Sequence, residues 1–232
     1  MIERRRAQDR GHADHGWLNS HHSFSFADYY EPSRMGYSTL RVLNEDRVAP
    51  GAGFPTHGHR DMEIISYVLD GALEHQDSLG NGSIIRPGDV QRMSAGSGVR
   101  HSEFNASQNE PVHFLQIWLL PERPGLAPGY EQKHYPESER HAQLRLIASR
   151  NGDEGSVSVH QDVRVYASLL RSGESVRHTP PAGRHHYLHV ARGELMVNGD
   201  TFLAGDAAII ADEPELLLDT PSLAEFLLFD LA

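Results

Sequence analysis

Two short motifs contain four side chains that could bind one metal ion. His57 and His59 are separated by Gly58, and His101 and Glu103 are separated by Ser102. A β-strand has a period of two, so each motif would present both of its side chains on one face. If the two strands are neighbours, three imidazole nitrogens and one carboxylate converge, which is a donor set for divalent transition metals. The sequence therefore predicts a metal site on these residues.

The chain contains no cysteine, which excludes disulfides, zinc fingers and iron–sulfur centres. Structural zinc sites are more often closed by thiolates. A site made of three histidines and one glutamate could leave coordination positions open, which favours catalysis or ligand sensing. The donor set alone suits Fe, Mn, Ni, Cu or Zn.

The elements that must position these motifs are short strands. Long helical patterns are scarce, and many short apolar runs end at Gly, Pro, Asn or Asp, which is typical of an all-β sandwich or barrel. We expect one short helix near 136–141. The expected strands are 38–43, 62–69, 82–85, 99–105, 112–120, 143–148, 163–170, 186–190, 194–198, 207–210, 215–218 and 224–228.

The chain is expected to form two domains. Residues 121–136 are rich in proline, glycine and charge, which predicts a linker. A weak repeat supports two halves, since Gly71 and Gly193 each end an apolar run, and a Gly-Asp turn follows each of them at Asp89 and Asp206. Chance similarity between β-hairpins is the alternative. We predict two tandem β-barrel domains, 1–135 and 136–232.

Residues around the two motifs resemble the cupin superfamily. Gly51 precedes the first motif and Glu63 follows it, while Gly98 and Asn105 flank the second. Three positions depart from the cupin pattern. The closing glycine of the first motif comes one residue late at Gly71, and in the second motif Gly96 replaces a proline and Val90 replaces a glycine.

A narrower resemblance is to the pirin family. It covers most of the chain and is carried by the blocks GHADHGWLNSHHSFSFADYYEP, PTHGHRDMEIISYVLDGALEHQDSLGN, MSAGSGVRHSEFN and FLQIWLLP. The resemblance implies a bicupin of two jelly-roll barrels, with metal in the N-terminal barrel only and a degenerate C-terminal barrel. It implies Fe(II) as the first choice of metal and assigns the ligand role to His57, His59, His101 and Glu103. Glu63 would then support the site or the fold without being a ligand.

The family also implies a function. Several pirin-like proteins are similar to quercetinases, so we expect a metal-dependent dioxygenase that cleaves flavonol-like or aromatic substrates with O2, in which Glu103 is the catalytic base. The alternative is a non-catalytic regulator that responds to the metal or its redox state and acts through a protein partner.

Charge and hydropathy exclude other partners. The chain has 21 Lys and Arg against 32 Asp and Glu, a formal net charge of −11, which disfavours direct binding to nucleic acid. The basic run Arg4–Arg6 is expected to be a solvated end. No apolar run approaches the roughly 18 residues needed to span a bilayer. We expect a cytoplasmic monomer.

Other polar residues have less specific interpretations. His21 and His22 either line the pocket or take a capping or core role, and His75, His113 and His160 are expected to be ordinary hydrogen-bonding residues. Gln116 is a candidate buried polar group facing the pocket, because it shares a strand face with aromatic residues. The histidines near residues 185–189 are not spaced as a second metal site.

Overall fold

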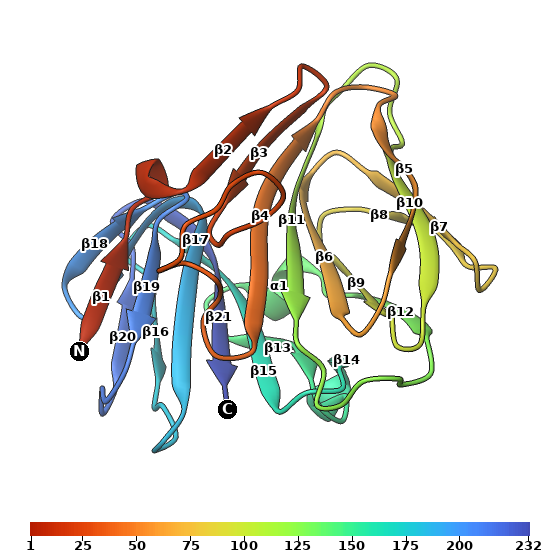
Figure 1. Ribbon diagram of the computed structural model, residues 1–232. Coiled ribbons are helices and arrows are strands. Elements are labelled where there is room, and N and C mark those ends of the chain that lie inside the picture. Colours follow the sequence, from red (N-terminus) through yellow and green to blue (C-terminus); the bar gives the residue numbers. More distant parts are fainter. The chain divides into compact units, whose positions relative to one another are not determined.

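The computed structural model describes residues 1–232 and forms two compact units (Figure 1). The N-terminal unit comprises Arg10–His134 and Val157–Gln161, and the C-terminal unit comprises Met1–Asp9, Tyr135–Ser156 and Asp162–Ala232. Helical segments are short: α1 (Glu137–Arg140) and the 3-10 turns η1 (Ala7–Asp9) and η2 (Asp153–Gly155). No helix has both the length and the apolar character required to cross a membrane.

The N-terminal unit contains two antiparallel sheets. One has the order β12-β9-β6-β11-β4-β3-β2 and the other β5-β10-β7-β8. The strands of the first are β2 (Gly11–Asp14), β3 (Leu18–His22), β4 (Leu40–Val48), β6 (Glu63–Asp70), β9 (Asp89–Ser94), β11 (Val112–Leu119) and β12 (Gly129–His134). Those of the second are β5 (Gly53–His59), β7 (Leu73–Asp77), β8 (Gly82–Ile85) and β10 (Val99–Asn105), and β14 (Val157–Ser158) is a short additional strand.

Near-continuous apolar sequences build the middle of the larger sheet. The strand β6 reads EIISYVLD and is buried up to its last residue, and β11 reads VHFLQIWL. Val68, Leu73, Ile85 and Phe114 pack into one core cluster. Each fully buried side chain of this size contributes about 1.5–3 kcal/mol by leaving water. These strands are therefore a rigid support for the few polar residues that they carry.

The C-terminal unit is also built from antiparallel strands. Its main sheet runs β1-β19-β17-β21-β15-β13, while β18 and β20 pair with β17, and β16 pairs with β20. The bounds are β1 (Ile2–Arg5), β13 (Arg145–Ser149), β15 (Val163–Arg171), β16 (Ser175–His178), β17 (His185–Val197), β18 (Asp200–Leu203), β19 (Ala207–Ile210), β20 (Leu216–Asp219) and β21 (Leu223–Leu231). The all-β prediction is confirmed.

Two predicted strands, 186–190 and 194–198, are instead one long strand, β17. The register with β21 shifts between Val190 and Arg192. Gly193 follows with φ 73°, and a Cβ atom there would lie 1.8 Å from the Leu223 carbonyl oxygen. Glycine therefore bends the strand here without ending it, since only glycine tolerates both the conformation and the close approach.

The linker prediction for 121–136 is wrong over its second half. Residues 129–134 form β12, which pairs with β9 from Gly129↔Ser94 to His134↔Asp89. The helix expected near 136–141 is confirmed as α1. Strand pairing outweighs local composition here, because β9 would otherwise expose an unpaired edge.

The predicted domain limits, 1–135 and 136–232, stay a prediction. The first residues belong to the C-terminal unit, because β1 pairs with β19 in the register Ile2↔Ile210 to Arg5↔Ala207. Residues 157–161 likewise belong to the N-terminal unit. Nothing in the local sequence of either segment indicates these assignments.

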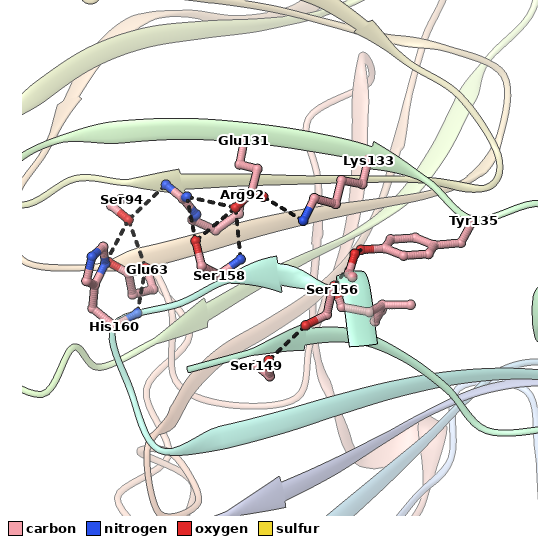
Figure 2. Close-up of polar contacts among 12 residues, drawn as sticks. Glu63, Arg92, Ser94, Glu131, Lys133, Tyr135, Ser149, Ser156, Ser158 and His160 are labelled. Atoms are coloured by element: carbon pink, nitrogen blue, oxygen red, sulfur yellow. Dashed lines mark hydrogen bonds and ion pairs between the residues drawn. The ribbon is translucent and has the colours of Figure 1, made fainter. Parts of the chain in front are cut away.

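Glu63 holds residues 157–161 within the N-terminal unit. This carboxylate, which is 1% exposed, accepts hydrogen bonds from Ser94 Oγ at 2.8 Å and from the His160 backbone N–H at 3.2 Å. Figure 2 shows these contacts. The His160 ring lies 3.3 Å away through Nδ1. Beside it, Glu131 accepts bonds from the Ser158 backbone and hydroxyl groups at 2.8 and 2.9 Å. Glu63 is thus fully used in supporting the fold.

We predict that Glu63→Gln lowers the free energy of unfolding by about 1–3 kcal/mol. The carboxylate accepts from Ser94 Oγ and the His160 N–H, and the NH2 group of glutamine, itself a donor, cannot accept from them. Metal content should equal that of the wild type, since Glu63 lies in neither residue group able to hold a metal. Urea unfolding and elemental analysis check this. Loss of metal without loss of stability would contradict the structural role.

Candidate metal centre

The two motifs lie on neighbouring strands, which is the condition for a shared metal site. His57 and His59 lie on β5, and β10 runs antiparallel beside it, with His101 opposite His57 and Val99 opposite His59. The imidazole centroids of the three histidines are 4.5–4.8 Å apart. Each offers a ring nitrogen within 4.8 Å of the others. Strand pairing thus assembles the three histidines of the expected site.

The protonation pattern of His57 follows from one hydrogen bond. Its Nδ1 lies 2.9 Å from the Pro55 carbonyl oxygen. A carbonyl oxygen only accepts, so Nδ1 carries the hydrogen and donates it. In the neutral ring Nε2 then carries a lone pair, which is the form in which histidine binds a metal.

A chain of hydrogen bonds selects the same pattern for His101. Gln91 Nε2 donates to His75 Nδ1 at 3.2 Å, so the Nε2–H of His75 donates to Asp77 Oδ2 at 3.1 Å. His101 Nδ1 lies 3.4 Å from His75 Nδ1 and is the donor in that contact. The lone pair of His101 is therefore on Nε2. A partner of this kind fixes ring orientation and raises ligand basicity.

Two lone pairs consequently face each other, because His57 Nε2 and His101 Nε2 are 3.1 Å apart. Only a proton or a metal cation between or beside them makes this arrangement favourable. Burial, reinforced by the neighbouring histidines, lowers the pKa of His101 to about 2, and burial followed by the charge of His57 lowers that of His59 to about 4. Protonation of His101 and His59 is thus disfavoured, and the three imidazoles fit a divalent metal.

Glu103 lies beside this group and is almost completely buried. Gln116 Nε2 donates to its Oε2 at 2.7 Å and Ser66 Oγ to its Oε1 at 3.2 Å. Burial raises its pKa to about 7, and the negative charge of Asp46 adds to the rise. By ligand-atom distance Glu103 groups with His101 and His75, not with the complete histidine triad. Its place among the ligands remains a prediction.

A row of polar side chains crosses the apolar sheet and supports the carboxylate. His22 is opposite Asn44, Asn44 opposite Gln116, Gln116 opposite Ser66, and Ser66 opposite Gln91. The row bonds to Glu103 through Gln116 and Ser66, and to the His101 chain through Gln91. Each buried polar group of this kind is expensive unless it is bonded.

A cavity of about 620 Å³ opens onto the site between the two sheets of the N-terminal unit. His57, His59 and Glu103 line it. Aromatic walls are supplied by Trp17, Phe26, Tyr29, Phe54 and Trp118. This volume and lining suit a flat aromatic molecule of several rings.

Asp46 is a second buried carboxyl in the same cavity. Its side chain lines the cavity and accepts a hydrogen bond from Ser20 Oγ. Burial raises its pKa to about 7, and the neighbouring Glu45 adds to the rise. No feature of the sequence around Asp46 distinguished it from surface acids.

The remaining polar predictions have mixed outcomes. Gln116 faces the cavity as expected, and His22 lines it too, whereas His21 stacks on His12. His113 bonds Glu45 and His160 bonds Glu63, which confirms them as hydrogen-bonding residues. His75 is one as well, but nothing in the sequence indicates that it contacts His101. Ser66 could have been found as a lone polar residue within the apolar stretch of EIISYVLD. Gln91 gives no such signal, because the strand DVQRMS is mostly polar.

Two family patterns match the chain. The pattern of the pirin family, described as "Pirin", matches residues 3–119, and that of the "Quercetinase C-terminal cupin domain" matches residues 146–231. The prediction of two cupin domains is thereby confirmed.

The chain is similar to proteins from several bacteria. It is 45% identical to a "Quercetin 2,3-dioxygenase" of Escherichia coli, with 100% of this chain and 99% of the relative covered. It is 43% identical to a "Pirin-like protein" of Caulobacter vibrioides over 100% of both chains. The crystal structure of the bacterial pirin YhhW of Escherichia coli in complex with nickel(II) superposes with a TM-score of 0.94 at 45% identity, covering 100% and 99% of the two chains.

We predict that His75→Phe weakens metal binding about tenfold or more, because His101 loses the acceptor that fixes its ring. Competition with a chromophoric chelator measures the affinity. His134→Phe, a change at an exposed histidine that bonds only Asp89, is the matched control and should leave affinity unchanged. Equal affinities for both variants would show that the chain does not orient His101.

We predict that Asp46→Asn stabilises the metal-free protein increasingly as the pH rises. The pKa of this carboxyl is about 7 in the folded protein and near 3.8 when it is exposed. Below pH 3.8 the carboxyl is neutral in both states and the folded protein has its full stability. As the pH rises from 3.8 through 7, ionisation favours the unfolded state and this stability is lost. Asparagine does not ionise, so the variant does not lose stability in this way. The Tm difference, variant minus wild type, should grow from about pH 5 to about pH 8. A difference independent of pH would contradict the raised pKa.

Proposed function

Because this chain belongs to the pirin family, we propose that it is a metal-dependent dioxygenase that cleaves flavonols such as quercetin with O2. The observation that carries the proposal is the convergence of three imidazoles, two of which line a large cavity with aromatic walls. Two relatives from Escherichia coli strains that are named quercetin 2,3-dioxygenase, similar over the full length of the chain, support the same reaction.

We propose His57, His59, His101 and Glu103 as the ligands and Fe(II) as the resident metal. Three imidazoles and one carboxylate suit iron, and also the nickel(II) that the crystal structure of YhhW contains. When bound, such a metal supplies Lewis acidity and, where it is redox-active, one-electron chemistry toward O2.

The catalytic role proposed for Glu103 is to accept the proton of the substrate hydroxyl. Its pKa of about 7, raised by burial, suits proton transfer near neutral pH. Gln116 and Ser66 each donate to one of its oxygens, so the carboxylate is held in a fixed orientation. The proton moves from the hydroxyl oxygen to a carboxylate oxygen, and the negative charge moves to the substrate.

The cavity walls account for the rest of the proposed activity. Trp118 lies edge-on to His59, with centroids 4.9 Å apart, and Phe26 packs edge-on to Trp118 at 5.4 Å. Apolar rings at these positions would pack against a flat substrate and exclude water, which strengthens the polar interactions inside.

We predict that chelation abolishes carbon monoxide release from quercetin and that added metal restores it. Glu103→Gln should lower kcat/KM by about 100-fold or more, because proton acceptance of this kind contributes 10²–10⁴-fold. Glu110→Gln, an exposed carboxylate in a loop, is the control and should retain full turnover.

The assay separates the proposals. Chelation-resistant turnover would contradict metal dependence, and full turnover by Glu103→Gln would remove its role as base. Bound metal without turnover of any flavonol would leave the regulator that acts through a protein partner as the better explanation.

A further inference from the structure

Asp46 lines the cavity but has no role in the proposed chemistry. It lies on β4 together with Asn44 on the cavity face, while Glu45 between them faces the other way. Glu45 is neutralised by Arg10 at 2.8 Å and Arg47 at 3.0 Å. The two consecutive acids therefore differ: one is in a salt-bridge network, and the other faces the cavity.

The carboxyl of Asp46 has an incomplete set of partners. The side chain is 4% exposed, and Ser20 Oγ donates to its Oδ1. No cation pairs with it, and Oδ2 accepts no hydrogen bond from the protein. A buried carboxyl in this state costs stability, so the energetics favour a ligand that completes it.

The strand register places Asp46 near the metal site but not in it. Asp46 is opposite Phe114 on β11, two residues from Gln116, which donates to Glu103. Diagonal neighbours across a strand pair lie about 7–8 Å apart. A molecule that reaches both carboxyl groups must therefore carry polar atoms on separate parts of an extended frame.

We propose that Asp46, positioned by Ser20, forms a second polar subsite that accepts a hydrogen bond from a hydroxyl group on an outer aromatic ring of the substrate. The proposal rests on the proposed function, in which the hydroxyl on the central flavonol ring is held at the metal site. A phenolic O–H is the matching donor for a carboxylate oxygen, and hydrogen bonds of this type are among the short, strong ones.

The cavity supplies its own reporters of binding. The chain has only two tryptophans, Trp17 and Trp118, and both line the cavity. Quenching of their fluorescence measures binding of a flavonol to metal-loaded protein without O2, so the measurement does not depend on turnover.

The test compares quercetin with 3-hydroxyflavone, which keeps the central hydroxyl and lacks every outer-ring hydroxyl. Asp46→Asn should weaken quercetin binding about tenfold, as expected for loss of one hydrogen bond to a charged group. Binding of 3-hydroxyflavone should change less than about twofold. Glu45→Gln, which removes the acid on the opposite face of the same strand, should preserve both affinities. Thermal melting of each variant establishes that it is folded.

The outcomes are distinct. If Asp46→Asn weakens both flavonols equally, or neither, the subsite is refuted although the protein binds flavonols. If the wild type binds neither compound, the flavonol function itself fails and the subsite fails with it.

Discussion

The approach of two imidazole nitrogens is the constraint on which the rest of the structure depends. His57 Nε2 and His101 Nε2 are 3.1 Å apart, and the hydrogen bonds on the far side of each ring leave both with lone pairs. Burial keeps His101 from being protonated. Without a cation this arrangement is repulsive, so the apolar sheets must be stable enough to hold it. The thoroughly buried strands β6 and β11 provide that stability.

One row of buried polar groups in the larger sheet serves the site. The row from His22 to Gln91 crosses five strands. Gln116 and Ser66 bond the Glu103 carboxylate, Gln91 bonds the histidine chain, and His22 bonds Asn44. Asp46 differs from the members of this row, because Ser20 satisfies one of its oxygens and no protein group satisfies the other. Natural proteins accept such local cost mainly at functional positions.

The sequence predicted the parts of the site that depend on local periodicity. Alternation placed His57 with His59, and His101 near Glu103, on the correct strands, and the strands 82–85 and 99–105 have the predicted bounds. The long-range pairing of strands could not be predicted from the sequence. It determines the shift between His101 and Glu103 against β5, the contact of His75 with His101, and the conversion of a linker-like segment into β12. Each depends on which strand lies beside which, and local composition does not encode that choice.

The most direct test of the metal centre is a crystal structure of the metal-loaded protein, with the ion located by anomalous scattering. The account predicts one ion per chain, bound by His57, His59 and His101 through Nε2 and by Glu103, and accessible from the cavity. An ion bound instead by the other group of close ligand atoms, His75, His101 and Glu103, or one elsewhere in the chain, would contradict it.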